Sequence, residues 1–244
     1  MARLCRLAQF ARIQSTWTGS MNVHPKVRPI RVHEGRFEPV QAALNAAQAL
    51  QSGQVIATPT DTIYGLAALA QNREAVQKLY QIKGRHADKP IAICVGQIED
   101  IYTWSEVTVA RAVLERLLPG PVTVIFRRKP ELNLEFNPGT DLVGIRIPDH
   151  PFILAVCHQA QGPVALTSAN VSSAPSTLAV EEFAALFPEL HSVYDGGRIS
   201  DTEEARLGST VVDLSEPGSY RLVRPGSARL RTVKVLEKIG LTPR

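Results

Sequence analysis

The stretch VIATPTDTIYGL (Val55–Leu66) shows most clearly how this chain folds, because an apolar run stops at a proline and polar side chains follow. Val55–Thr58 has the length and composition of a buried strand, and Pro59 cannot donate a ladder hydrogen bond. Residues 40–51 form an Ala-rich pattern typical of a helix, which Gly53 ends. A helix that leads into a buried strand predicts an α/β or α+β domain, with helices packed on a sheet.

The rest of the body continues this alternation. Further predicted helices cover residues 73–82, 109–118, 152–159, 180–186 and 233–239, and further predicted strands cover 91–95, 122–127, 143–147, 164–167, 193–194, 210–214 and 220–223. Helical connections favour parallel strand pairs, whereas the short connection between the last two strands favours an antiparallel pair. We therefore expect a mixed sheet. No repeat or linker divides the body, so we expect one domain over residues 32–244.

Composition excludes several classes of protein. The chain has 244 residues, of which 44% are hydrophobic and 20% charged, as in ordinary globular proteins and unlike disordered, collagen-like or coiled-coil chains. Its 3 cysteines are widely spaced, so neither a disulfide framework nor a cysteine-rich zinc site is expected. No apolar run approaches the ~20 residues that span a bilayer, so no transmembrane segment is predicted.

The first 31 residues form a basic N-terminal arm that we expect to lie outside the fold. Residues 1–36 contain seven Lys and Arg side chains and one acid. Of the chain's 27 basic and 23 acidic side chains, 20 and 22 therefore lie in residues 37–244, which are close to neutral. An arginine-rich, acid-free start is typical of a mitochondrial transit segment; a disordered basic tail is the alternative. We expect mitochondrial and cytoplasmic locations, with Met21 as a hypothetical second start.

Polar side chains follow two of the predicted buried strands, where open α/β sheets place their ligand sites. Familiar catalytic motifs are absent: the sequence has no P-loop, GxGxxG, HExxH or GxSxG, and its 6 histidines share no ligand spacing. Thr60, Asp61 and Thr62 could recognise a small polar substrate, or form a turn that simply ends the strand. Ser168 and Asn170 could bond phosphate oxygens, or cap a helix.

Cations stand near the same positions. Lys83, Arg85 and Lys89 belong to the segment KGRHADKP between a predicted helix and a predicted strand. Fork-shaped guanidinium and mobile ammonium groups suit a triphosphate, although a solvated basic loop is the commoner reading of such a run. Arg146 lies between isoleucines inside a predicted strand, so it meets either a structural acid or a substrate carboxylate.

Together these groups indicate nucleotide chemistry. Ser209 and Arg224 add a further hydroxyl and a further cation, and no nucleophile or metal cage is evident. A pocket of several cations and many hydroxyls can catalyse by positioning its substrates and neutralising their charge, without covalent catalysis.

Seven motifs, in order, resemble the YrdC family of threonylcarbamoyl-AMP synthases over about Ala43–Gly226. They are PTDTIYGL, KGRHADKP, LPGPVTVIF, VGIRIPDHP, TSANVSS, GSTVVDL and RPG. The resemblance implies a single YrdC-like domain with a twisted, mixed open sheet and a basic concave face. It implies a nucleotidyltransferase that makes L-threonylcarbamoyladenylate and pyrophosphate from L-threonine, bicarbonate and ATP. A separate tRNA threonylcarbamoyl transferase then uses this product to form threonylcarbamoyl-adenosine (t6A) at position 37 of tRNAs reading ANN codons.

The resemblance also implies roles for individual residues. The expected ATP-binding residues are Lys83, Arg85, Lys89, Ser168, Asn170, Ser176 and Arg224. Four of these, Lys83, Arg85, Ser168 and Asn170, are the expected catalytic residues. The expected threonine-binding residues are Thr60, Thr62, Arg146 and Ser209. Mg²⁺ is expected to enter with ATP, with no dedicated protein metal site. Many relatives have histidine where this chain has Cys94.

Two other classes of function stay open on the residues alone. A double-stranded RNA-binding module would use the same cations on the RNA backbone, although the near-neutral body disfavours it. A carbamoyl-transfer module, like the related domain of hydrogenase-maturation proteins, is disfavoured by the lack of zinc-finger cysteines. RNA is a further candidate partner, which the protein could bind weakly in addition to its enzymatic activity. If Lys83 is a pocket cation, Lys83→Ala should abolish synthesis and leave the fold intact.

Overall fold

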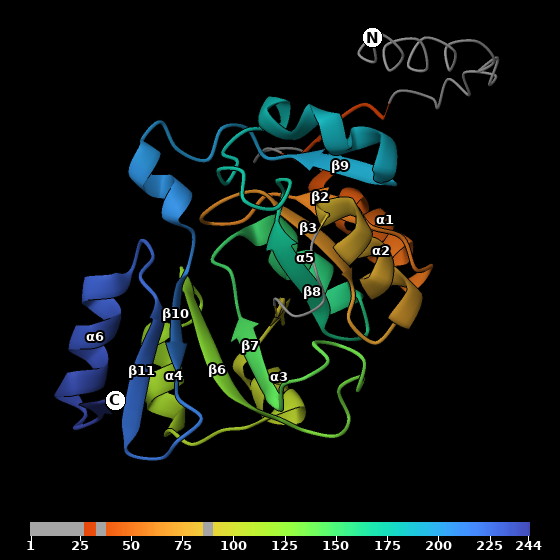
Figure 1. The fold of residues 1–244 in the computed structure, drawn as a ribbon. Coiled ribbons are helices and arrows are strands. Elements are labelled where there is room, and N and C mark those ends of the chain that lie inside the picture. The colour runs from red at the N-terminus through yellow and green to blue at the C-terminus, as the bar shows by residue number, and fades with distance from the viewer. Residues whose placement is uncertain (1–26, 33–37, 85–89) are drawn as a thin grey trace, which may run out of the picture.

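Strands and helices alternate along the chain, as the sequence predicts (Figure 1). The structure is a computed structural model that describes residues 27–32, 38–84 and 90–244. Its helices are α1 (Glu38–Gln51), α2 (Arg73–Lys83), α3 (Ile98–Trp104), α4 (Arg111–Leu117), α5 (Pro151–Gln159) and α6 (Arg229–Lys238), with 3-10 helices η1 (Val180–Glu189) and η2 (Glu203–Leu207). Its strands are β1 (Ile30–Arg31), β2 (Ile56–Thr58), β3 (Gly65–Leu69), β4 (Ala92–Cys94), β5 (Ser105–Glu106), β6 (Val122–Arg128), β7 (Leu142–Arg146), β8 (Val164–Ser168), β9 (Ser192–Asp195), β10 (Thr210–Asp213), β11 (Ser219–Arg224) and β12 (Thr242–Pro243).

One mixed sheet runs through the described residues, in the order β1-β9-β2-β3-β8-β4-β7-β6-β10-β11-β12, with β5 paired to β6. Parallel pairs such as β4–β7 and β6–β10 alternate with antiparallel pairs such as β3–β8 and β6–β7. The expected antiparallel pairing of β10 with β11 is confirmed. Strand β1 pairs with β9, so the sheet includes Ile30 and Arg31, which the sequence analysis assigned to the arm. Residues 1–26 of that arm lie outside the described residues.

The two faces of the sheet carry different helices. Helices α1 and α5 pack together and cover one face, where Ile56, Cys94 and Val164 belong to their core. Side chains alternate along a strand, so neighbours such as Ala57 and Ile93 belong to the larger core with α2, α3, α4 and η1. In Figure 1, β11 and α6 lie at the opposite side of the molecule from α1 and α2. No helix of the described ranges is long and apolar enough to cross a membrane.

Helix α2 is well delimited by its sequence. The Asn72 side chain accepts a hydrogen bond from the Ala75 amide at its start. Gly84 ends it with a left-handed backbone, φ 55°, and its N–H donates to carbonyls of the last turn. Because the helix ends there, Lys83 lies in its last turn, beside the segment 85–89 that falls outside the described residues.

Several elements differ from expectation, among them the short elements β5, η2 and β12, which were not predicted. Strand β3 was not predicted, because its sequence GLAAL is small and weakly strand-forming. It lies between β2 and β8, and a Cβ at Gly65 would stand 2.7 Å from Leu166 Cδ1. Helix α3 was also missed, and the predicted helix 180–186 is the longer 3-10 helix η1, which contains Pro188.

Candidate functional site

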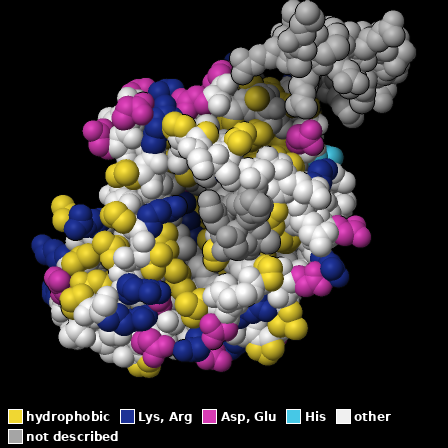
Figure 2. All heavy atoms as spheres, viewed as in Figure 1, with side chains coloured by type: hydrophobic (Ala, Val, Ile, Leu, Met, Phe, Trp, Pro, Cys, Tyr) yellow, Lys and Arg dark blue, Asp and Glu magenta, His cyan; other side chains and the backbone are white. Residues whose placement is uncertain are grey.

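A cavity of about 360 Å³ lies against the middle of the sheet, on the face that α1 and α5 share. Successive side chains of a strand point to opposite faces of the sheet, and this alternation decides which residues line the cavity. Thr123 and Ile125 of β6 line it, whereas Val124 between them faces the larger core. On β7, Arg146 lines it and Ile145 does not. Figure 2 shows Lys and Arg side chains gathered on the β11 and α6 side of the molecule, beside the centre of the view.

The cavity collects most of the predicted site residues. Its wall includes Thr60, Arg146, Ser168, Ser176, Ser209 and Arg224, which come from six separate segments of the chain. Three more predicted residues, Lys83, Thr62 and Asn170, are buried behind this wall. Arg85 and Lys89 lie outside the described residues, so their predicted roles stay predictions.

Lys83 holds the loop that follows β8. Its side chain is 2% exposed, and its ammonium donates to the carbonyl oxygens of Ser168 and Asn170, both at 2.6 Å. It also donates to Asn170 Oδ1 at 2.8 Å and lies 3.2 Å from Ser168 Oγ. The Asn170 amide group in turn donates to Ala174 O at 2.6 Å. A charged donor shared among buried acceptors fixes their geometry, so Lys83 positions the whole Ser168–Asn170 segment.

The open question about Arg146 has a structural answer, because its guanidinium forms a buried ion pair with Asp61 Oδ1. The same nitrogen, Nη2, donates to Thr62 Oγ1 at 2.8 Å. Thr62 Oγ1 lies 3.2 Å from Thr60 Oγ1, and the Thr60 hydroxyl donates to Ile63 O at 2.7 Å. The threonine-rich loop is therefore both a turn and the wall that orients Arg146.

Ser209 and Arg224 form a second polar cluster across the cavity. Arg224 Nη2 donates to Ser209 O at 2.9 Å and lies 3.2 Å from Ser209 Oγ. The sequence analysis missed Thr123, whose hydroxyl lies 2.8 Å from Ser209 Oγ. A Cβ at Gly226 would stand 2.3 Å from the Ser209 carbonyl carbon, so only glycine allows this close approach.

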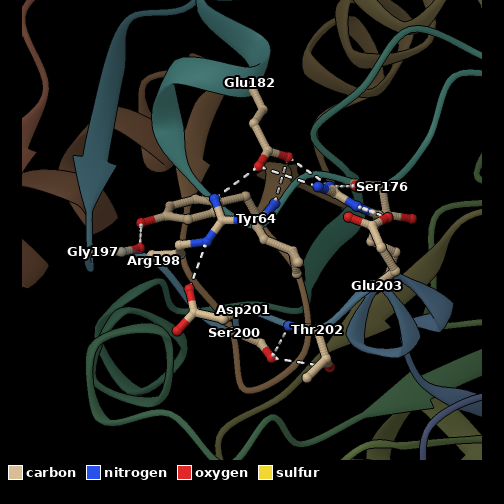
Figure 3. A network of polar contacts seen from close by, with 11 residues as sticks. Tyr64, Ser176, Glu182, Gly197, Arg198, Ser200, Asp201, Thr202 and Glu203 are labelled. Carbon is tan, nitrogen blue, oxygen red and sulfur yellow. Dashed lines mark hydrogen bonds and ion pairs between the residues drawn. The ribbon is translucent and has the colours of Figure 1, made fainter.

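Ser176 is held by a network of ion pairs (Figure 3). Arg206 donates to Ser176 O and to Glu182 Oε2, each at 2.6 Å, and Glu182 also pairs with Arg198. The hydrogen bond from Arg206 lowers the pKa of Glu182. This network ties η1 to the segment before β10, and so fixes the wall that carries Ser176 and Leu207.

Two other side chains beside the cavity are unreactive. Burial raises the pKa of the Cys94 thiol to about 12, so the thiol is protonated and not a nucleophile at neutral pH. Burial also raises the pKa of Tyr64, whose hydroxyl donates to Gly197 O at 2.6 Å and accepts from the Gly196 amide. Within the ranges that the structure describes, no three His, Cys, Asp or Glu side chains gather as metal ligands.

Comparisons with known proteins agree with one another. The Sua5/YciO/YrdC family model, described as telomere recombination, matches residues 48–226. The mouse protein named threonylcarbamoyl-AMP synthase is 50% identical over 220 residues, 84% of this chain and 79% of its own. The human protein of that name is 51% identical, covering 82% and 74%. Sua5 of Pyrococcus abyssi complexed with L-threonine superposes with a TM-score of 0.78 at 29% identity; the match covers 89% of this chain and 62% of that longer one.

Proposed function

Because the chain belongs to the Sua5/YciO/YrdC family, we propose that it makes L-threonylcarbamoyladenylate and pyrophosphate from L-threonine, bicarbonate and ATP. This activity is the one that its relatives' names carry, and the P. abyssi Sua5 structure contains L-threonine. The product serves t6A formation in tRNA, and the reaction class is nucleotidyl transfer.

The observation that carries the proposal is the arrangement of cations around the cavity. Arg146 and Arg224 come from different strands of the sheet, and hydroxyls of Thr60, Ser168 and Ser209 share the same wall. Two anions, an amino-acid carboxylate and a nucleotide phosphate, can therefore occupy one cavity of about 360 Å³. Holding both reactants in line supplies the rate enhancement by proximity and charge neutralisation.

The reaction needs no protein nucleophile. Bicarbonate takes up a proton and loses water to give carbon dioxide, and the threonine amine adds to the carbon dioxide and releases a proton to form a carbamate. A carbamate oxygen then attacks the α-phosphorus as pyrophosphate leaves. We assign Arg146 to the threonine carboxylate, with Thr60, Thr62 and Ser209 beside it. We assign Arg224, Ser168 and Ser176 to the nucleotide, with Lys83 and Asn170 as the support of that wall.

Further assignments follow the family resemblance and, for the cellular location, the basic composition of the arm. Arg85 and Lys89 act on the ATP phosphates, and Mg²⁺ enters with ATP as part of the substrate. The adenylate passes to a tRNA threonylcarbamoyl transferase. The basic arm of residues 1–31 directs part of the protein to the mitochondrion, and the rest acts in the cytoplasm.

The test is synthesis by the purified chain with ATP, Mg²⁺, isotopically labelled bicarbonate and either threonine or serine, followed by mass spectrometry. We expect a threonine-dependent adenylate that carries one labelled carbon. Arg224→Met should raise the KM for ATP by about tenfold or more, because it removes one charged hydrogen bond to the nucleotide. Arg221→Met is the matched control, because Arg221 lies on the same strand but pairs with Asp213 outside the cavity. A folded chain that forms no adenylate contradicts the proposal.

A further inference from the structure

The ion pair between Asp61 and Arg146 is buried but incompletely satisfied. The side chains are 10% and 7% exposed. One oxygen, Asp61 Oδ2, and one nitrogen, Arg146 Nε, are buried without a hydrogen-bond partner among the described residues. Buried polar groups are nearly always paired, and an ion pair that serves only the fold gains from satisfying its remaining atoms. The incomplete pairing therefore indicates that this ion pair is not optimised for the stability of the fold alone.

The hydrogen bonds around Arg146 fix its orientation. The Thr60 hydroxyl donates its proton to Ile63 O. In the contact between the two threonine hydroxyls, Thr62 is therefore the donor and Thr60 the acceptor. Thr62 Oγ1 is then an acceptor for Arg146 Nη2, which also binds Asp61 Oδ1. With Nη2 held from two sides, the planar guanidinium cannot rotate. The hydrogen bonds of Arg146 to the described residues all use Nη2, and Nη1 is not among the buried unpartnered atoms, so Nη1 is the terminal nitrogen of this cavity-lining residue that is left for a ligand.

Charge is the second part of the argument. The charged side chains among the described residues of the cavity wall are Arg146 and Arg224, and no acid lines it. Asp61, directly behind Arg146, is the carboxylate that neutralises it. An unneutralised guanidinium in a poorly solvated site attracts any anion, including the phosphates of ATP and the pyrophosphate product. A neutralised one binds an amino-acid carboxylate without competing for phosphates.

We propose that Asp61 is the positioning residue of the amino-acid subsite: it orients Arg146 and, by neutralising it, makes the subsite select a carboxylate over phosphate-like anions. The inference rests on the proposed function, since it concerns the threonine end of the same cavity. It predicts two separable effects of Asp61, one that depends on its position and one that depends on its charge.

Two substitutions separate these effects in the full chain. Asp61→Asn keeps the shape and removes the charge; it should strengthen inhibition by inorganic sulfate against threonine and leave the KM for ATP within about twofold. Asp61→Glu keeps the charge and shifts the carboxylate that orients Arg146; it should raise the KM for threonine by about tenfold and leave sulfate inhibition as in the wild type. If Asp61→Asn does not fold, Asp61→Glu still tests the positioning effect.

The matched control is Asp213→Asn. Asp213 is also a buried carboxylate paired with arginines, but its partners Arg221 and Arg244 do not line the cavity, whereas Arg146 does. This variant should lose stability and keep the wild-type KM for threonine. A rise in the KM for ATP as large as that for threonine in Asp61→Glu, or unchanged sulfate inhibition in Asp61→Asn, overturns the proposal.

A binding readout separates failure of this inference from failure of the proposed function. Sulfate should raise the melting temperature of Asp61→Asn more than that of the wild type, with no substrate present. If the wild type makes no adenylate, the proposed function fails, and this melting comparison still tests the role of Asp61. Equal sulfate stabilisation of both proteins refutes the inference alone.

Discussion

Replacing Lys83 with methionine should weaken the fold as well as the activity. The sequence predicted a pocket cation whose loss leaves the fold intact, but its ammonium is buried and donates to Ser168 O, Asn170 O and Asn170 Oδ1. Methionine has a similar volume and no donor, so these three acceptors lose a partner in a buried place. At about 1 kcal/mol for each orphaned acceptor, less the relief of burying one charge fewer, the expected loss is about 2–3 kcal/mol.

The measurement is thermal unfolding of the purified variant without substrates. In a domain of 150–250 residues a loss of 1 kcal/mol lowers the melting temperature by roughly 2–4 °C, so Lys83→Met should melt about 5–10 °C lower. Urea unfolding gives the free energy directly, with an unchanged slope if the denatured state is unaffected. Synthesis of the adenylate should be lost at temperatures where the variant is still folded.

Lys78 supplies the control on the same helix. Its side chain is only partly buried, and it makes no hydrogen bond or ion pair with the described residues. Lys78→Met should therefore change the melting temperature by no more than about 1–2 °C, as surface substitutions usually do. If Lys83→Met melts like Lys78→Met and merely loses activity, the anchoring role argued from the hydrogen bonds is wrong.

Three further predictions concern other parts of the cavity. Gly226→Ala should lower the melting temperature and raise the KM for ATP, because the added Cβ displaces the Ser209 backbone; steady-state kinetics and a melt check this, and wild-type values for both contradict it. Cys94 should resist alkylation by iodoacetamide at pH 8 in the folded chain, since its pKa is raised to about 12, and peptide mass spectrometry detects any labelling. Glu182→Gln should reduce the loss of stability on acidification. Because the pKa of Glu182 is lower in the folded chain than its ordinary value of about 4.3, its carboxylate stabilises the fold at pH values above that ordinary pKa, and this stabilisation is lost as the pH falls through the pKa of the folded state. Urea unfolding of both proteins at about pH 5 and about pH 3 measures the difference.

Local patterns predicted most of the fold. The run Val122–Arg127 became β6, and the amphipathic stretch 73–82, with Asn72 before it and Gly84 after it, became α2. Strand β3 (Gly65–Leu69) could not be found in this way, because its small residues are selected by close packing against β8 and not by strand propensity. Tertiary packing, which a single sequence does not display, supplied what the local pattern lacked.

The candidate site was likewise predictable from the sequence only in part. Residue type and position after a strand were enough to nominate Thr60, Ser168 and Ser209. The partner of each cation was not predictable, because Asp61 lies 85 residues before Arg146 in the sequence. The sequence therefore left a structural acid and a substrate carboxylate as alternatives for Arg146, and the structure supplies the acid while leaving one terminal nitrogen for a ligand.

Each described cation of the site uses part of its hydrogen-bonding capacity on the protein itself. Lys83 binds the loop after β8, Arg146 binds the loop after β2, and Arg224 binds the backbone of Ser209. These bonds join segments far apart in the sequence, so they act on stability and on the geometry of the cavity at once. A cation held in this way is preorganised for an anion, because its orientation is set before the substrate arrives. Substitutions of these cations should therefore change melting temperature and substrate KM together, whereas Asp61→Glu, which keeps the charge of the buried pair, should change the KM for threonine and not the KM for ATP.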